Sequence, residues 1–386
     1  MSIRFSTRTA WDTGESSLAA AVRRARGEGR ELIDLTVSNP TVCGFEYDAE
    51  AILDPLKNAR ALTYDPDPRG MRSAREAVAE YYAGHRAEVH PDAIVLTTST
   101  SEAYGYLFRL LCDAGDEVLV AQPSYPLFDF LADLEDVRLT PYPLFYDYGW
   151  WIDFAELERR IGPRTRAIIV VHPNNPTGHG TKPAERQRLE DLAAKHGLAL
   201  IVDEVFLDFS FSNTGNESLV SFTSGENKTL IFVLSGLSKI AGLPQMKVGW
   251  IVCRGPETGM ADALSRLEVI ADTFLSMNAP AQLALPAWLG LRDSLRRQIL
   301  ERCTVNLGEI DAYGIERLMV EAGWNAVLRL PRIDLGALEL LDRASVIVHP
   351  GEFYGMQGSD KAIVSLICPE DDFREGMRRI ASCLGR

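Results

Sequence analysis

The stretch SGLSKIAGLPQMKVGW, residues 235–250, carries two lysines just beyond the apolar run TLIFVL at 229–234. The apolar run is typical of a buried strand. Lys239 and Lys247 follow it among small and apolar neighbours. Because burying an ammonium group is costly unless the group is paired or loses its proton, we expect these two lysines to have a chemical role at the end of a strand.

Similar apolar runs occur on the N-terminal side of this stretch and alternate with amphipathic segments. Strands are predicted at 92–98, 116–125, 166–175, 198–206, 229–235 and 247–253. Helices are predicted at 101–115, 125–134 and 182–197. Strands that are apolar throughout and separated by helices indicate an α/β fold with a mostly parallel sheet covered on both faces.

The two ends of the chain have a different pattern. Residues 255–309 are predicted to be mainly helical. The last hundred residues combine predicted strands and a closing helix, at 326–331, 344–350, 361–368 and 371–384. A chain of this length favours two domains. We predict a large α/β domain at 46–275 and a smaller α+β domain formed by 1–45 and 276–386.

Charge and composition restrict the class of partner. The net charge of −14 argues against nucleic acid or an anionic membrane as the main partner. The six cysteines include no closely spaced pair, which is typical of a reducing compartment. No apolar run approaches the roughly 20 residues needed to cross a bilayer, and residues 1–17 lack the apolar segment of a signal peptide. We expect a cytoplasmic protein.

Polar residues follow several of the predicted strands, where open α/β sheets bind their ligands. They are Ser99 to Ser101, Tyr125, Asn174, Asn175, Asp203 and Lys239. The hydroxyl-rich turn before the helix at 101–115 could bind a phosphate or simply cap the helix. Likewise, Tyr125 could lie on a planar cofactor or pack in the core, and the two asparagines could be ordinary turn residues.

Asp203 and Lys239 restrict the kind of ligand that this predicted site could bind. A buried carboxylate needs a cation or several donors. Neither a histidine nor a second cluster of acids suggests a metal site here, whereas a protonated ring nitrogen would satisfy Asp203. A buried lysine can lose its proton and attack a carbonyl, and Lys247 could retain its charge beside a phosphate. Together these groups describe a site for pyridoxal phosphate.

The sequence resembles the class I/II aminotransferases, which are fold type I pyridoxal-phosphate enzymes. The resemblance extends over nearly the whole chain. Its motifs, in order, are LTVSNPT (35–41), YDPDPRG (64–70), TTSTSEA (97–103), PSYP (123–126), HPNNPTG (172–178), VDEVF (202–206), SGLSK (235–239) and HPGEFYG (349–355). A single such motif would be weak evidence, but the ordered set is specific.

The resemblance implies a role for each matching residue. Lys239 would form the Schiff base with pyridoxal 5'-phosphate and move a proton during catalysis. Asp203 would pair with the ring nitrogen, Asn175 would donate to the phenolic oxygen, and Tyr125 would stack on the ring. The further expected cofactor contacts are Ser99, Thr100, Ser101, Phe206, Ser235, Ser238 and Lys247. Tyr64 would reach the phosphate of a neighbouring subunit, which implies a homodimer with shared active sites.

Several positions depart from the family pattern. Lys247 stands where arginine is usual, Gly236 where serine is usual, and Phe206 replaces a tyrosine that would donate to the phenolic oxygen. Ile363 stands where the family has the arginine that binds the substrate carboxylate. Ser38 stands where many relatives have glycine. The candidate substrate residues are therefore Ser38, Asn39 and Lys361, with Arg329 and Arg332 as alternatives to Lys361 that could equally be surface charges.

The function predicted from the sequence is transfer of an amino group between an amino acid or amine donor and a 2-oxo acid. The same fold also supports β-lyases, decarboxylases and racemases, which differ in the bond broken at the α-carbon. A non-catalytic sensor that keeps the fold is another alternative. A dinucleotide-dependent dehydrogenase is disfavoured, because no G-x-G-x-x-G follows the first strand.

Overall fold

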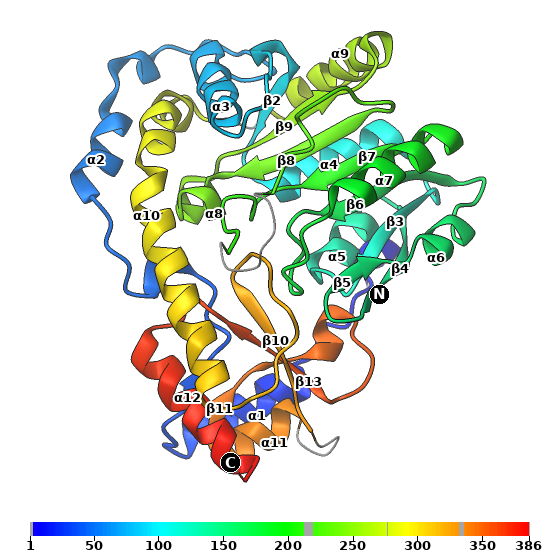
Figure 1. The fold of residues 1–386 in the computed structure, drawn as a ribbon. Coiled ribbons are helices and arrows are strands. Elements are labelled where there is room, and N and C mark those ends of the chain that lie inside the picture. The colour runs from blue at the N-terminus through cyan, green and yellow to red at the C-terminus, as the bar shows by residue number, and fades with distance from the viewer. Residues whose placement is uncertain (1–2, 212–218, 276, 332–335, 386) are drawn as a thin grey trace.

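The computed structural model describes residues 3–211, 219–275, 277–331 and 336–385, and its ribbon is drawn in Figure 1. An eight-stranded sheet forms the larger part of the molecule. Its strands are β2 (Ile94–Thr97), β3 (Glu117–Gln122), β4 (Arg138–Tyr146), β5 (Trp150–Ile152), β6 (Thr165–Val171), β7 (Ala199–Asp203), β8 (Ile231–Gly236) and β9 (Gly249–Arg254). They lie in the order β2-β9-β8-β7-β6-β3-β4-β5.

The centre of this sheet is parallel, as the sequence predicts. Strands β8, β7, β6, β3 and β4 run in one direction, β9 is antiparallel to both of its neighbours, and β5 is antiparallel to β4 at the edge. Successive residues of one strand enter different cores. In β6, for example, Ile168 and Val170 join one apolar cluster while Ala167 and Ile169 join another. Because both faces are buried, the strands are apolar throughout rather than alternating.

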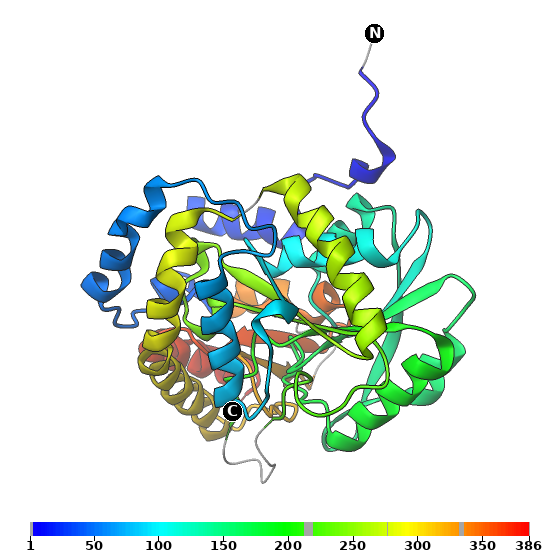
Figure 2. The ribbon, with the colours of Figure 1, turned by 90° about the horizontal axis from the view of Figure 1, so that it is seen from above.

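Helices cover both faces of the sheet and surround the smaller sheets. They are α1 (Ser17–Gly27), α2 (Ala49–Leu53), α3 (Arg72–Gly84), α4 (Thr100–Leu111), α5 (Leu127–Leu134), α6 (Phe154–Arg159), α7 (Pro183–His196), α8 (Leu237–Ile240), α9 (Glu257–Phe274), α10 (Ala279–Ala312), α11 (Ala337–Ala344) and α12 (Glu370–Cys383). In the view of Figure 2 the first described residues extend away from the body, and Ile3 and Phe5 are exposed.

Two small sheets form the other part of the molecule. An antiparallel sheet has the order β10-β13-β12, formed by Asn325–Arg329, Lys361–Ser365 and His349–Pro350. A parallel pair joins β1 (Ile33–Asp34) to β11 (Val346–Ile347). Residues from the start of the chain thus pair with residues near its end, as the predicted small domain requires. The division at 45 and 275 itself stays a prediction.

The long helix α10 links the two parts (Figure 1). Residues in its first half, including Leu285 and Trp288, are buried in the cluster that contains one face of the large sheet. Residues in its second half, including Ile299 and Ile310, are buried with the small sheets. One continuous helix therefore contributes to both cores.

Some elements differ from the sequence-based expectation. β4 was not predicted, because its two prolines, Pro141 and Pro143, and its mixture of buried and exposed positions hide an edge-side strand. The single strand predicted at 344–350 is wrong, because the chain there passes from one small sheet to the other as β11 and β12. Among the residues that the structure describes, no helix is both long and apolar enough to span a bilayer.

Candidate active site

The candidate site lies where β7 and β8 end side by side. These strands are parallel, and Asp203, the last residue of β7, has Leu234 of β8 as its Cα partner. β8 continues to Gly236, and the short helix α8 then places Lys239 one turn further on. The Lys239 Nζ atom lies 4.9 Å from the ring centroid of Trp324 and 5.6 Å from that of Phe206.

Lys239 is partly exposed to the cavity, and the rest of its side chain is packed against the protein. This burial disfavours the charged ammonium and lowers the pKa of Lys239 to about 8, although the nearby Asp203 carboxylate partly opposes the shift. A fraction of the amine is therefore neutral at physiological pH, and a neutral amine is the form that attacks a carbonyl. The two aromatic rings restrict the amine to the cavity in front of it.

Asp203 is 7% exposed, and its carboxylate is held from two directions. The backbone N–H of Val205 donates to Oδ1 at 3.1 Å, and the hydroxyl of Tyr104 donates to Oδ2 at 3.2 Å. Burial nevertheless raises the pKa of Asp203 to about 6, against the lowering effects of these two donors and of Lys239. A cationic ring nitrogen would stabilise the ionised form.

The two asparagines of the HPNNPTG motif have different contacts in the structure. Asn174 maintains the turn, since its Oδ1 accepts from the Thr177 hydroxyl at 2.8 Å. Asn175 lines the cavity, and its Oδ1 accepts from Nδ2 of Asn325 at 2.8 Å. The hydrogen bond fixes the amide of Asn175, so that its Nδ2 remains available as a donor to a ligand.

The cavity in front of Lys239 has a volume of about 420 Å³. Aromatic and apolar side chains dominate its wall. Its lining residues are Thr36, Ser38, Tyr125, Pro126, Leu127, Phe130, Asn175, Phe206, Lys239, Trp324, Asn325, His349, Phe353 and Tyr354. Tyr125 is 43% exposed and stands at the entrance as a face on which a planar ring could stack.

The start of α4 closes one end of the strand-end crevice. Ser99 caps this helix by accepting the backbone N–H of Glu102 at 3.1 Å, and Thr100 and Ser101 form its first turn. Gly249 lies so close to this turn that a Cβ there would be 2.9 Å from the carbonyl carbon of Ser99. The free N–H groups of a helix start favour a phosphate.

Other predicted phosphate contacts lie on β8, on α8 and in the turn before β9. The Ser235 hydroxyl is fully buried and has no hydrogen-bond partner among the described residues. Ser238 is half-buried, and Lys247 is exposed in a left-handed turn conformation with φ 53°. A helix start, an unsatisfied hydroxyl, a buried carboxylate and a stacking aromatic surface fit pyridoxal phosphate. Of the predicted cofactor residues, Tyr125, Asn175, Phe206 and Lys239 line the cavity, and the roles of the whole set stay a prediction.

The predicted substrate residues are only partly brought together. Ser38 lines the cavity. Asn39 and Lys361 do not line it, because Asn39 caps a turn by accepting the Thr41 hydroxyl at 2.8 Å, and Lys361 Nζ lies 2.8 Å from Oδ1 of Asp360. Of the alternatives to Lys361, Arg329 forms an ion pair with Glu316 at 2.8 Å, whereas Arg332 lies outside the described residues.

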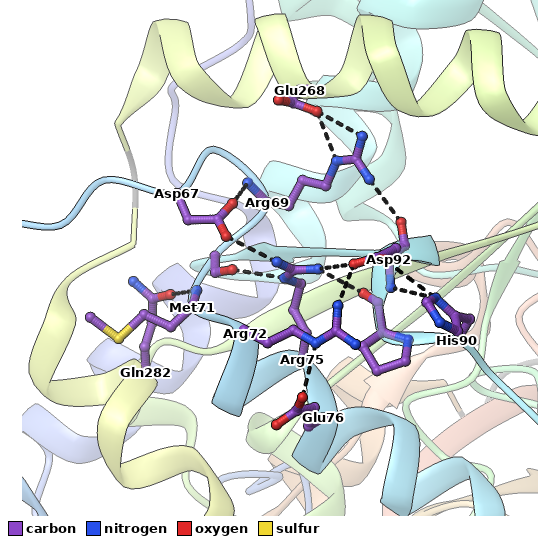
Figure 3. Close-up of polar contacts among 12 residues, drawn as sticks. Asp67, Arg69, Met71, Arg72, Arg75, Glu76, His90, Asp92, Glu268 and Gln282 are labelled. Carbon is purple, nitrogen blue, oxygen red and sulfur yellow. Dashed lines mark hydrogen bonds and ion pairs between the residues drawn. The ribbon is translucent and has the colours of Figure 1, made fainter.

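Tyr64 lies on the surface, 79% exposed and outside the cavity lining. In the segment that follows Tyr64, Asp67 and Arg69 are held by ion pairs (Figure 3). The guanidinium of the buried Arg75 donates to Asp67 Oδ2 at 2.9 Å, to the Gly70 carbonyl at 2.8 Å and to Asp92 Oδ1 at 3.0 Å. A large aromatic residue on a preorganised surface loop is suited to contact a second chain.

Sequence reasoning assigned no role to several residues of the site. Tyr104, Trp324, Asn325 and His349 all contact or line it. Tyr104 sits inside a helical pattern with no sign of its target, and the strand predicted at 326–331 begins just after Trp324 and Asn325. His349 is the first residue of the HPGEFYG motif, and its place in that motif is the signal by which it could have been found.

Comparisons with known proteins agree with this geometry. The family model for aminotransferase class I and II matches residues 30–380. The glutamate-pyruvate aminotransferase AlaA of Haemophilus influenzae is 27% identical over 94% of this chain and 92% of its own length. The arginine–pyruvate transaminase AruH of Pseudomonas aeruginosa is 28% identical over 97% of this chain and 94% of its own. The AlaA protein of Escherichia coli is 28% identical over 69% of this chain, and the chain spans 66% of that relative's length.

Solved structures show the same fold. The alanine aminotransferase from Pyrococcus furiosus superposes with a TM-score of 0.86 at 23% identity, covering 99% of this chain and 100% of the other. At this identity the likeness bears on the fold alone. The family model, in contrast, extends over most of the sequence and includes every motif of the site. The chain therefore belongs to the class I and II aminotransferases, a family of pyridoxal-phosphate-dependent enzymes.

Proposed function

We propose that this protein binds pyridoxal phosphate through Lys239 and transfers an amino group from an amino acid to a 2-oxo acid. L-Alanine and pyruvate would be one amino acid and its corresponding 2-oxo acid among the substrates. The observation that carries the proposal is a partly buried lysine, with a pKa of about 8, that lines a cavity beside the buried carboxylate of Asp203. The substrate pair is suggested by the names of the relatives, which refer to pyruvate or alanine.

Each side chain has a place in this proposal. When bound, pyridoxal phosphate supplies a carbonyl for the amino group and a ring that accepts electrons from the α-carbon. Asp203 would hold the ring nitrogen in its charged form, Asn175 would donate to the phenolic oxygen, and Tyr125 would lie against the ring. The start of α4, together with Lys247, binds the phosphate. The Lys239 amine would move a proton from and to the substrate α-carbon.

We extend the proposal to assembly and location. Tyr64 points outward on its fixed loop, and Leu62 beside it is 91% exposed, which supports a homodimer in which Tyr64 contacts the phosphate site of the partner. All six cysteines are free thiols, which supports a reducing cytoplasmic setting.

The test is to saturate the purified protein with pyridoxal phosphate and to record its absorbance while L-alanine and then pyruvate are added. Transamination predicts that L-alanine removes the visible band of the bound cofactor, that pyruvate is formed in equal amount, and that added pyruvate restores the band. Release of ammonia or carbon dioxide instead, or formation of D-alanine, would contradict transamination. Lys239→Ala is the control, because it should show neither the band nor its exchange.

A further inference from the structure

The cavity wall formed by the small antiparallel sheet lacks a cation at the expected strand position. Ile363 of β13 is fully buried, and its Cα partners are Val327 of β10 and His349 of β12. Partners in an antiparallel ladder project their side chains to the same face, with Cβ atoms about 5 Å apart. His349 therefore emerges beside the position where the family has its carboxylate-binding arginine.

Two other cations project from this face of the sheet, but both are already paired. Lys361 and Arg329 are Cα partners located two residues further along their strands. The ammonium of Lys361 contacts Asp360, and the guanidinium of Arg329 contacts Glu316. Neither residue lines the cavity. Apart from Lys239, His349 is the one residue in the cavity lining that can carry a positive charge.

His349 also differs from the other histidines of the chain. Each of the other five has a carboxylate or backbone partner: His85 with Asp208, His90 with Asp92, His172 with the N–H of Thr181, His179 with Glu185, and His196 with Glu158. Within the described part of the chain, the ring nitrogens of His349 have no such contact. Its ring is oriented instead by stacking on Phe353, with centroids 5.3 Å apart and planes 16° from parallel.

We propose that His349 binds the substrate carboxylate in place of the missing arginine, with Ser38 and Asn325 as neighbouring polar groups in the same cavity. This inference rests on the proposed function, because it names the group that holds the substrate of that reaction. An imidazole donates one or two N–H groups to a carboxylate, whereas arginine forms a bidentate pair. His349 is thus a weaker and pH-dependent substitute for the arginine.

The charged groups around His349 determine the direction of the pH effect. Burial lowers the pKa of His349, while Asp34 on the neighbouring strand β1 opposes this shift. Asp34 is itself held by Arg26 at 3.6 Å and by the Thr36 hydroxyl. Tyr354, packed edge-on against the imidazole, stays neutral because burial raises its pKa. Lys239 lines the same cavity, and a positive charge on its amine would disfavour imidazolium.

A bound carboxylate should raise the pKa of His349, because an anion favours the protonated imidazole. The affinity of a carboxylate should therefore be highest at low pH. It should fall as the pH rises through the interval between the pKa of His349 in the empty protein and its pKa in the occupied protein.

The first experiment compares L-alanine with L-alaninamide, which lacks the anionic carboxylate, in the half-reaction of the cofactor-loaded protein. His349→Asn should raise the KM for L-alanine about tenfold or more, with a smaller effect on the limiting rate, and should leave the KM for the amide nearly unchanged. His196→Asn, a histidine at the end of α7 remote in sequence from the motif, is the matched control and should change neither. Equal effects of His349→Asn on the two substrates would overturn the proposal, because they would indicate lost packing on Phe353.

The second experiment does not depend on turnover or on a variant that folds well. The imidazole pKa of His349 is measured by NMR in the wild-type protein, with and without propionate, which is L-alanine without its amino group. Propionate should raise this pKa by about one unit and leave that of His196 unchanged. No shift would overturn the proposal. A shift in a protein that does not transaminate L-alanine would support the carboxylate site and contradict the proposed function instead, so the two failures are distinguishable.

Discussion

At the scale of single residues, the site depends on two groups whose charges are disfavoured by burial. In water a lysine and an aspartic acid titrate near 10.4 and 3.9. In this structure the pKa of Lys239 falls to about 8 and that of Asp203 rises to about 6. Both shifts have desolvation as their largest cause. The cofactor would relieve both, by consuming the amine and by placing a cation against the carboxylate.

The lowered pKa of Lys239 predicts how the apoprotein captures its cofactor. Only the neutral amine attacks the carbonyl, so the capture rate should rise with pH up to about 8 and then level off. An ordinary lysine would give a rate that keeps rising to about pH 10. Stopped-flow mixing of apoprotein with pyridoxal phosphate over a pH series measures this dependence. A continuous rise above pH 9 would show that burial does not activate this lysine.

The raised pKa of Asp203 predicts that this residue destabilises the apoprotein. A folded pKa above the unfolded value means that stability is greatest below about pH 4 and is lost as the pH rises through about 6. Asp203→Asn should therefore stabilise the apoprotein at pH 7.5, by on the order of 1–3 kcal/mol, and should nearly abolish transamination. Urea unfolding of both proteins at pH 7.5 and pH 4 tests this. The difference should vanish at pH 4, and a variant that is less stable at pH 7.5 would contradict the account.

At the scale of elements, close contact between the start of β9 and the start of α4 shapes the proposed phosphate end of the site. β2 and β9 are adjacent antiparallel strands, with Thr97 and Gly249 as Cα partners. The absence of a side chain at Gly249 lets the turn at Ser99 and Thr100 approach the sheet. The glycine acts here through close approach rather than through a special φ angle.

Gly249→Ala tests this arrangement. A Cβ at 249 would lie 2.9 Å from the backbone of Ser99 and 3.1 Å from the Thr100 nitrogen, so the turn must move. We expect a loss of about 1–3 kcal/mol in the free energy of unfolding and weaker binding of pyridoxal phosphate. Gly290→Ala in the exposed face of α10, where nothing lies within 4 Å, is the control. It should stabilise by about 0.5–1 kcal/mol. Unchanged cofactor affinity in Gly249→Ala would show that the turn does not bind the phosphate.

Whether a strand could be predicted from the sequence depended on its position in the sheet. The strands of the sheet centre were predictable, because burial on both faces makes each one a continuous apolar run, as in β6 and β7. The edge-side strand β4 was not, because its exposed positions and prolines interrupt that signal. Lys239, Asp203 and Asn175 could be singled out from the sequence as candidates because each polar residue lies at the end of an apolar strand or a few residues beyond it.

The residues that could not be predicted reach the site from a distance along the chain. Tyr104 belongs to α4 and contacts Asp203, 99 positions away. Asn325 contacts Asn175 across 150 positions. Trp324 resembles any core aromatic until the small sheet places its ring against Lys239. Such contacts depend on how the two parts of the molecule pack, and no local pattern encodes that packing.

At the scale of the whole molecule, α10 joins the large sheet, which carries the proposed cofactor residues, to the small sheet that contributes to the wall of the cavity. The cavity lies between them, lined by Asn175 and Lys239 from one part and by Asn325 and His349 from the other. The exposed Tyr64 and its fixed loop suggest that a second copy of the chain completes the site. The large sheet, the small sheet and the second chain would then each contribute residues to one active site.

Mixing two inactive variants tests the shared site. Tyr64→Ala should bind cofactor weakly, and Lys239→Ala should be inactive. If Tyr64 acts on the partner, refolding the two variants together should produce mixed dimers with one intact site each, and roughly a quarter of wild-type activity for random pairing. Activity no higher than the sum of the separate variants would show that Tyr64 does not act across an interface. A monomer in analytical ultracentrifugation would exclude the dimer itself.

The central claim is that Lys239 binds pyridoxal phosphate covalently and releases it when an amino donor reacts. The most direct measurement is to reduce the cofactor-loaded protein with borohydride and to locate the bound cofactor by peptide mass spectrometry, before and after treatment with L-alanine. The account predicts a covalent cofactor on the peptide that contains Lys239, its loss after L-alanine, and its return after pyruvate. A cofactor attached to another lysine, or a label on Lys239 that L-alanine does not remove, would contradict it.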